Sequence, residues 1–291
     1  MFGVAVFLFI ALCIVSVSFY KNHKRLKIRT TILQNNVLTS ADWLQSGKGK
    51  YIGEGFEGCE SQNDLHAIRT KNGTRLLFFD THGSMTVDIV GGEIERGTYD
   101  FSDIHFKEGD VVIDVGGNIG MISIFLAKKF PFLKIYAFEP VKENFENFKR
   151  NMKLNGISED SIIVYNLAVT KDGRDVEMSV NAGNSGASSI SEWQLVPEKK
   201  SLVLENVPSC TLKDIFIQNN ITSCKLLKMD CEGSEYEILY NTDEEFLRRC
   251  ENLRAEFHEN ATLRKKWGTA RKLKRYIKQF IPKTKVEPDI D

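Results

Sequence analysis

Residues 111–120 read Val-Val-Ile-Asp-Val-Gly-Gly-Asn-Ile-Gly. The first five are β-branched apart from one aspartate, as in a parallel strand that is buried on both faces. The glycines that follow allow a tight turn and let a ligand approach the backbone closely. A helical segment is expected at residues 121–130, before Pro131. This order predicts a strand, a ligand-binding loop and a helix.

The chain beyond this stretch alternates between apolar strand-like runs and helical segments. Residues 142–154 carry a one-sided apolar stripe. Ser234 and Glu237 have the spacing of a capping box for a later helix, and a basic helix is expected near residues 262–280. Such alternation predicts an α/β domain with a central, mostly parallel sheet and right-handed crossovers. The remaining strands are expected at 135–138, 162–169, 226–229 and 253–257.

An acidic residue follows the second strand, in Phe138-Glu-Pro140. A carboxylate at that place can accept hydrogen bonds from both hydroxyls of a ribose. Together with the glycine loop, Glu139 therefore predicts a cofactor that contains a nucleoside.

The spacing of the loop separates S-adenosylmethionine from a dinucleotide. A dinucleotide fingerprint that ends at Gly120 needs a glycine at position 115, where the chain has valine. The methyltransferase pattern, an acid followed by G-x-G-x-G, fits Asp114, Gly116, Asn118 and Gly120 with asparagine at the middle position. A nicotinamide-dependent oxidoreductase and a non-catalytic, membrane-tethered binding module are the alternatives.

Four pieces of the chain extend the pattern: Gly109-Asp-Val-Val-Ile-Asp-Val-Gly-Gly-Asn-Ile-Gly120, Ala137-Phe-Glu-Pro140, Asn166-Leu-Ala-Val169 and Leu227-Lys-Met-Asp-Cys-Glu-Gly-Ser-Glu235. Together they resemble the FkbM family of S-adenosylmethionine-dependent methyltransferases, over about residues 95 to 260. The resemblance implies a class I methyltransferase, Rossmann-like fold and, usually, O-methylation of a hydroxyl on a sugar, glycan or secondary metabolite. It also implies a cofactor site at Asp114, Gly116, Asn118, Gly120 and Glu139, with Gly117 standing where the family often has alanine.

The candidate catalytic residues follow from the chemistry of methyl transfer to an alcohol, which is an in-line displacement helped by a base. Ligands of open α/β sheets bind beyond the carboxyl ends of the strands, where Asp230, Glu232 and His258 are expected. Asp230 is equally suited to binding the amino group of the cofactor. In other readings Glu232 caps a helix and His258 is structural, or Asp230 and Glu232 hold Mg²⁺.

The N-terminus has the pattern of a membrane anchor, since residues 2–20 carry no charge and nearly span a hydrocarbon core. Five cations and no acid follow in residues 21–29, which predicts a single-pass protein with its catalytic domain in the cytosol. The alternative is a cleaved signal peptide and a secreted or lumenal enzyme. The expected parts are an anchor at 1–20, a basic juxtamembrane linker at 21–50, a β-containing extension at 51–108 with strands at 76–79 and 85–90, a methyltransferase domain at 109–282 and a tail at 283–291.

The composition limits the partners of the chain. The formal net charge is zero, so nucleic acid is not expected, and the acceptor is expected to be a small molecule or a glycan or lipid-linked compound. Because residues 21–29 and 264–278 are basic and contain no acid, the rest of the chain is net acidic, which suits a cationic cofactor. The six cysteines fit no disulfide or zinc pattern.

Overall fold

The computed structural model describes residues 63–70, 73–81, 84–96, 101–181, 186, 188–193 and 202–287, all within the compact unit Glu60–Asp291. The expected membrane segment and its basic linker lie outside these residues. Within the described part, no helix is both long and apolar enough to cross a bilayer.

The elements are β1 (Asn63–Arg69), β2 (Arg75–Thr81), α3 (Thr86–Arg96), β3 (Val111–Val115), α4 (Met121–Lys129), β4 (Lys134–Phe138), α5 (Lys142–Leu154), β5 (Ile162–Tyr165), β6 (Ala168–Val169), β7 (Val176–Asn181), β8 (Ser189–Ile190), the 3-10 helix η2 (Ser191–Trp193), β9 (Leu202–Val207), β10 (Ser209–Cys210), α6 (Leu212–Gln218), β11 (Leu226–Met229), α7 (Glu235–Asn241), α8 (Glu244–Leu247), β12 (Asn252–Glu256), α9 (Ala261–Trp267), α10 (Ala270–Ile277) and β13 (Lys283–Glu287).

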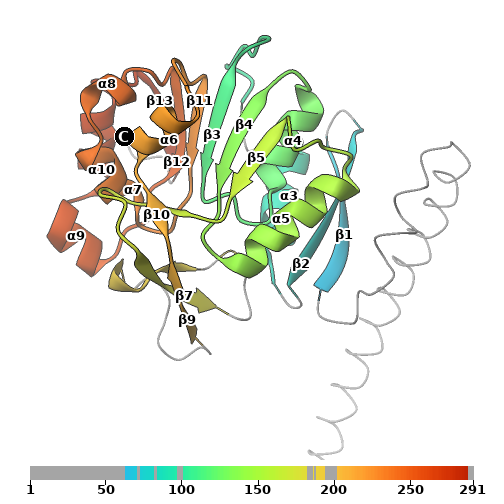
Figure 1. Cartoon of the computed structure of the whole chain (residues 1–291), viewed down its shortest axis with the longest axis horizontal. Coiled ribbons are helices and arrows are strands. Elements are labelled where there is room, and N and C mark those ends of the chain that lie inside the picture. The colour runs from blue at the N-terminus through green and yellow to red at the C-terminus, as the bar shows by residue number, and fades with distance from the viewer. Residues whose placement is uncertain are drawn as a thin grey trace, which may run out of the picture. The chain divides into compact units, whose positions relative to one another are not determined.

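The central sheet has six strands in the order β13-β12-β11-β3-β4-β5, and every neighbouring pair is parallel (Figure 1). The chain enters this sheet at β3, runs outward through β4 and β5, and then returns to the other side of β3 with β11. The strand order therefore reverses between β3 and β11. Ligands of open α/β sheets bind beside such a reversal, beyond the carboxyl ends of the strands. The expected α/β class with a parallel central sheet is confirmed.

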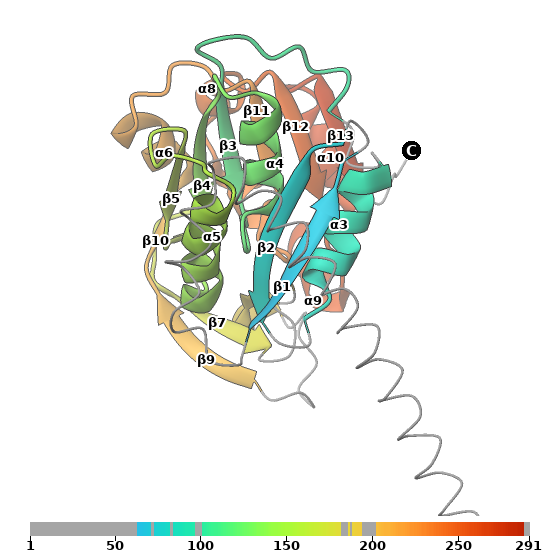
Figure 2. The same ribbon diagram turned by 90° about the vertical axis from the view of Figure 1, so that its right-hand side faces the viewer.

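Alternating side chains of the central strands contribute to two apolar cores, one on each face of the sheet. In β3, Val112 points into the core with α3, α4, α5 and the hairpin β1–β2, whereas Ile113 and Val115 point into the core with α6, α7, α8 and α10. Figure 2 shows the hairpin and α3 on the near side of the sheet. Because both faces are covered, the strands are nearly continuous apolar runs in the sequence.

Asn151 of α5 and Asn155, the residue directly after α5, bind the backbone of β2 as a neighbouring strand would. Asn151 Oδ1 accepts a hydrogen bond from Phe79 N at 2.7 Å, and Asn151 Nδ2 donates to Phe79 O at 3.0 Å. Asn155 makes the same pair of bonds with Leu77, at 3.0 and 2.7 Å. Asn151 Nδ2 also donates to Ile119 O of the glycine loop at 2.9 Å. Helix α5 therefore fixes the hairpin and the loop together.

A second sheet is inserted between β6 and β10. Its strands are antiparallel, lie in the order β8-β7-β9 and project from one end of the central sheet (Figure 1). Strands β6 and β10 pair with each other in parallel where the chain leaves and re-enters the main domain.

Four expectations about single elements are wrong. Residues 85–90 fall largely in helix α3 rather than in a strand, and residues 283–287 form a strand rather than part of a tail, because they pair with β12. The strand expected at 162–169 is divided, since β5 pairs with β4 whereas β6 pairs with β10. Gly268, with φ +95°, separates the expected basic helix into α9 and α10.

Candidate active site

A cavity of about 320 Å³ lies at the carboxyl ends of β3, β4 and β11, where the strand order reverses. Its volume is within the range of small-molecule sites. Asp114 and Gly120 are buried behind its wall. The other predicted site residues line the cavity: Gly116, Gly117, Asn118, Glu139, Asp230, Glu232 and His258.

The glycine loop leaves no space for side chains at its tightest positions. Gly116 has φ +78°, and an added Cβ would lie 1.8 Å from the carbonyl oxygen of Asp230. Gly120 has φ +88°, and its Cβ would lie 2.3 Å from the ring of Phe148. The loop is therefore packed between the end of β11 and helix α5, which fixes its backbone at the cavity wall.

Asn118 takes the place of the middle glycine in the methyltransferase pattern. Its φ is +48°, in the left-handed region that asparagine enters more readily than most residues. Asn118 N donates a hydrogen bond to Glu139 Oε2 at 2.7 Å. The glycine loop and the acid that follows β4 are thus joined directly, as the sequence pattern predicts.

Glu139 is buried at the cavity wall, with a carboxylate that faces the loop. It also accepts hydrogen bonds from Val141 N at 2.9 Å and Asn144 Nδ2 at 3.4 Å. Burial raises the pKa of Glu139 to about 7, although these hydrogen bonds and the charge of Lys228 lower it. A carboxylate has about four lone-pair sites, so one remains for a ligand hydroxyl.

A buried ion pair supports the loop from beneath. Lys228 Nζ lies 3.1 Å from Asp114 Oδ1 and donates to Gly116 O at 2.8 Å, while Ser123 Oγ donates to Asp114 Oδ2 at 2.6 Å. Lys228 and Asp114 are direct neighbours in the β3–β11 register. The sequence alone indicates no separate role for Lys228. The available signal was a lysine within the apolar strand 226–229.

The turn after β11 presents Asp230 and Glu232 to the cavity. Glu232 has φ +49°, a conformation that is uncommon for glutamate and is often found where function requires strain. The fully buried Glu235 holds the turn, because its carboxylate accepts hydrogen bonds from Cys231 N at 2.9 Å and Gly233 N at 3.0 Å. This supporting role of Glu235 could not be inferred from the sequence alone.

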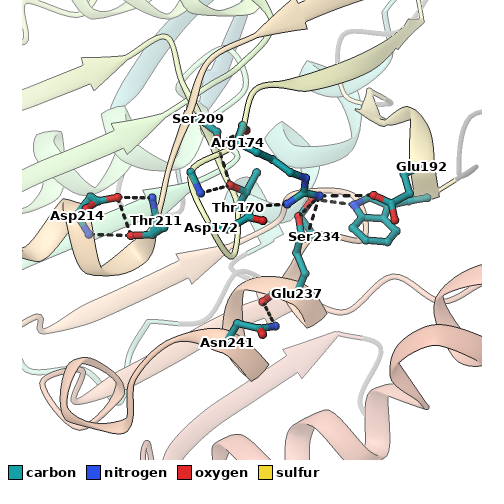
Figure 3. Close-up of polar contacts among 12 residues, drawn as sticks. Thr170, Asp172, Arg174, Glu192, Ser209, Thr211, Asp214, Ser234, Glu237 and Asn241 are labelled. Atoms are coloured by element: carbon teal, nitrogen blue, oxygen red, sulfur yellow. Dashed lines mark hydrogen bonds and ion pairs between the residues drawn. The ribbon is translucent and has the colours of Figure 1, made fainter.

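The capping box expected from Ser234 and Glu237 does not form. Ser234 makes no side-chain cap bond, and its hydroxyl accepts a hydrogen bond from Trp193 Nε1 at 3.1 Å. Glu237 binds Arg174 Nη2 at 3.1 Å, and Figure 3 shows Arg174 between Glu237 of α7 and Glu192 of η2. Both side chains therefore tie α7 to the inserted sheet, which forms one wall of the cavity.

His258 lies among three carboxylates. Its Nδ1 is 3.4 Å from Glu235 Oε1, and its Nε2 is 3.4 Å from Glu232 Oε2 and 3.5 Å from Glu256 Oε1. Burial alone would lower the pKa of His258, but the hydrogen bond and charge of Glu235, with the charges of Glu232 and Asp230, raise it to about 10. Burial raises the pKa of Glu232 to about 7, although the charge of His258 lowers it. Near neutral pH the histidine is a cation and Glu232 is close to its midpoint.

The group also has the spacing of a metal site, since ligand atoms of Asp230, Glu256 and His258 lie within 4.8 Å of one another. A histidine ligand needs a free lone pair on a ring nitrogen. Both ring nitrogens of His258 face carboxylate oxygens instead. In this structure both ring nitrogens belong to an ion-pair network.

Comparison with known proteins supplies the family. The model of the methyltransferase FkbM domain matches residues 114–277, more than half of the 291-residue chain. The chain belongs to the FkbM methyltransferase family. It is an S-adenosylmethionine-dependent methyltransferase, so the family and cofactor inferred from the sequence are confirmed and the nicotinamide alternative is wrong.

Several relatives share the region of this FkbM methyltransferase that forms the site. Methyltransferase 1 of Beauveria bassiana is 27% identical over 166 residues, which are 52% of this chain and 66% of that protein. The 31-O-demethyl-FK506 methyltransferase FkbM of Streptomyces tacrolimicus is 23% identical over 177 residues, which are 54% of this chain and 68% of that protein. The chain thus spans about two thirds of the length of these relatives.

Solved methyltransferase structures match the FkbM methyltransferase more remotely. A SAM-dependent methyltransferase from Agrobacterium tumefaciens matches with 13% identity and a TM-score of 0.32, over 66% of this chain and 50% of that one. The precorrin-6y C5,15-methyltransferase from Geobacter metallireducens matches with 11% identity and a TM-score of 0.31, over 55% of this chain and 58% of that one.

The residues of the cavity fit the cofactor of this FkbM methyltransferase. Gly116, Gly117 and Asn118 line the cavity, and at the two glycines a ligand can approach the backbone closely. The carboxylate of Glu139 keeps one acceptor site. Asp230 adds a carboxylate beside the loop, which suits a cofactor with a sulfonium and an amino group.

Proposed function

We propose that this enzyme transfers the methyl group of S-adenosylmethionine to a hydroxyl of a sugar, glycan or lipid-linked acceptor, with Glu232 as the base. The observation that carries the proposal is a second carboxylate in the cavity, besides the Glu139 that binds the glycine loop: Glu232 lines the cavity after β11 and has a pKa of about 7. A base that titrates near the working pH is the most effective in such a step, because it is both available and able to take a proton.

Each predicted cofactor residue has a distinct task in this proposal. The backbone around Gly116, Gly117 and Asn118 borders the methionine part. Glu139 accepts a hydrogen bond from a ribose hydroxyl, and Asp230 binds the amino group. Asp114 and Gly120 support the loop without lining the cavity. Asp114 holds Lys228 against Gly116 O, and Gly120 packs closely on Phe148. Catalysis then comes mainly from alignment within this rigid frame.

The choice among the three candidate bases rests on charge. His258 is already protonated at neutral pH and has no lone pair for a further proton. Asp230 lies 3.9 Å from Lys228 Nζ, which suits it to a fixed negative charge toward the cofactor. Glu232 therefore takes the hydroxyl proton. The bound cofactor supplies an electrophilic methyl carbon, to which the acceptor oxygen bonds as the carbon–sulfur bond breaks.

The mouth of the cavity favours an acceptor that has no negative charge. The side chains of Asp230, Glu232 and Glu256 are 33%, 24% and 52% exposed there and would repel a phosphate or carboxylate group. On α3, Ile89 lines the cavity and, like nearby Met85, is exposed by more than half, so an apolar part of the acceptor has a surface to contact. The Streptomyces relative is named for 31-O-demethyl-FK506, which supports an oxygen as the methyl acceptor.

The acidic mouth leads to a test of acceptor charge. We expect the full chain to methylate a neutral glycoside at least about tenfold faster than its phosphate ester, since one close like charge costs about 1.4 kcal/mol. The measurement is transfer of a labelled methyl group from S-adenosylmethionine to matched pairs of alkyl glycosides and their phosphates. Equal or faster transfer to the phosphate would contradict the proposed acceptor class. Transfer only to amines would contradict O-methylation itself.

Cofactor binding should depend on pH through Glu139. Its carboxylate is the form that accepts ribose hydroxyls, and below its pKa of about 7 the protein must release a proton to bind. We therefore expect the affinity for S-adenosylmethionine to fall by about tenfold per pH unit below neutrality, as measured by calorimetry.

The matched variants are Glu139→Gln and Glu146→Gln, which make the same change at the cavity and at an exposed position of α5. One hydrogen bond to a charged group is worth roughly 1.5–3 kcal/mol, so Glu139→Gln should weaken binding by at least about tenfold and remove the pH dependence. Glu146→Gln should bind as the natural chain does. Unchanged binding by Glu139→Gln would show that the ribose is held elsewhere.

We also propose that residues 2–20 anchor the enzyme in a membrane, with its catalytic domain in the cytosol. The support is the uncharged run followed by five cations in residues 21–29. The full chain should remain in the membrane fraction after an alkaline carbonate wash, whereas a chain that lacks residues 2–20 should not. Release of the full chain by the wash would rule out the anchor.

A further inference from the structure

The surroundings of His258 define its protonation state by geometry. This histidine follows β12, and its side chain is mostly buried, with 17% exposed. Nδ1 faces Glu235 Oε1 at 3.4 Å, and Nε2 faces Glu232 Oε2 at 3.4 Å and Glu256 Oε1 at 3.5 Å. Ionised carboxylate oxygens only accept hydrogen bonds, whereas a neutral imidazole can donate from one nitrogen only. This geometry therefore favours a proton on each ring nitrogen.

We propose that His258 is a permanent imidazolium, clamped by Glu235, and that this pair positions Glu232 as the base of methyl transfer. The proposal rests on the proposed function for the identity of the base. His258 is thus a positioning residue and takes no proton during the reaction.

Glu235 makes the clamp rigid. Its side chain is fully buried, and its two oxygens accept hydrogen bonds from Cys231 N and Gly233 N at 2.9 and 3.0 Å. A buried carboxylate with both oxygens occupied has one geometry, and a cation beside it compensates its charge. Glu235 therefore fixes both the backbone that flanks Glu232 and the imidazolium that faces it.

Glu232 is held from two sides by this arrangement. Its backbone has φ +49° between the two amides that Glu235 binds, and its carboxylate faces His258 Nε2. In the reaction, the acceptor O–H bond breaks, its proton passes to Glu232, the oxygen bonds to the methyl carbon, and the carbon–sulfur electron pair stays on sulfur. The imidazolium keeps both protons throughout and balances the negative charge of the mouth.

The charged groups around Glu232 set how the clamp affects its titration. His258 lowers the pKa of Glu232, whereas burial and the carboxylates of Asp230, Glu235 and Glu256 raise it. Removal of the imidazolium leaves only the groups that raise the pKa. The midpoint of Glu232 must then move to higher pH, and less of the base is ionised near neutrality.

The first experiment measures the charge of His258 in the natural chain and needs no acceptor. The chain carries five histidines, so ¹⁵N-histidine labelling and a His258→Gln variant identify its ring signals in long-range ¹H–¹⁵N spectra. We expect both ring nitrogens to keep imidazolium shifts at about pH 8.5, with a midpoint near 10. A midpoint near the ordinary value of about 6.5 would overturn the proposal.

The second experiment measures the effect of the clamp on Glu232. With ¹³Cδ-labelled glutamate, two carboxyl groups should titrate near pH 7, Glu139 and Glu232, and each is assigned by its own substitution to glutamine. In His258→Gln, the Glu232 midpoint should move to higher pH while that of Glu139 stays in place as the internal control. An unmoved Glu232 midpoint would overturn the positioning role.

Kinetics separate this inference from the proposed function. With a neutral glycoside as acceptor, His258→Gln should lower kcat by roughly 10²-fold through misplacement of the base and change the KM for S-adenosylmethionine little. Part of this loss should be recovered as pH rises, because Glu232 ionises at higher pH in the variant. If the titrations are as expected but the enzyme methylates no hydroxyl, the proposed function is refuted and the imidazolium is established. If hydroxyls are methylated and kcat is unchanged in His258→Gln, only the clamp is refuted. Glu235→Gln serves as a second variant, and it should lower the His258 midpoint.

Discussion

Replacing Glu232 with glutamine is expected to slow methyl transfer by roughly 10²–10⁴-fold, the usual contribution of a general base, while the affinity for S-adenosylmethionine stays within a few-fold. The two side chains have the same shape, but an amide cannot take the hydroxyl proton. Glu232 lines the cavity, and burial raises its pKa to about 7. The measurement is the initial rate of labelled methyl transfer to a neutral glycoside.

The pH profile of the same reaction provides the sharper signature. A base must be ionised, so at saturating cofactor the rate of the natural chain should rise with pH through about 7. Glu232→Gln should show no such rise. Glu251→Gln, at an exposed residue before β12 that pairs with Lys225, makes the same change at the amino-terminal end of the parallel strands, opposite the cavity, and should keep the full rate and profile. Substantial activity of Glu232→Gln near neutral pH would transfer the role of base to another group.

The cofactor side of the site could be predicted because its signals are local. A strand, a glycine turn and an acid after the next strand must come together whenever β3 and β4 are parallel neighbours, as they are. Asn118 shows how much a single position can reveal, since asparagine is the residue that best replaces a glycine with positive φ. The loop and Glu139 are indeed joined by one hydrogen bond at 2.7 Å.

The catalytic side could not be predicted in the same way, because the state of each residue depends on distant partners. The ordinary pKa of a histidine suits a base. His258 becomes a cation because of Glu235, which lies after β11, whereas His258 lies after β12. Lys228 gains its role only from the register that sets it beside Asp114. Neither contact can be predicted from the spacing of residues in the sequence.

Tertiary packing also explains the error at residues 85–90. The run contains β-branched residues, which favour strands, but Val87 and Ile94 share one face of α3 and are buried in the core beside the hairpin. Burial of that face outweighs the weak intrinsic preference of the segment. The same helix then brings Ile89 to the rim of the cavity, so the misread segment belongs to the proposed acceptor surface.

Gly116→Ala is expected to destabilise the cofactor-free chain by about 2–5 kcal/mol, the range for overpacking combined with a left-handed alanine. It should also abolish measurable binding of S-adenosylmethionine. An added Cβ would lie 1.8 Å from the carbonyl oxygen of Asp230, a backbone atom that cannot move away alone. Any relief would separate β3 from β11 and shift Asp230 and the loop together. The measurements are the urea midpoint and calorimetry with the cofactor.

Gly109→Ala separates the two causes of this effect. Gly109 also has a positive φ, +85°, but a Cβ there would meet nothing within 4 Å, so this variant carries only the backbone cost of about 1–2 kcal/mol. It should bind the cofactor as the natural chain does. If Gly116→Ala were no less stable than Gly109→Ala and still bound S-adenosylmethionine, the close approach of β11 to the loop would not be what shapes the site. The rigid loop would then not be what aligns the methyl group of the cofactor.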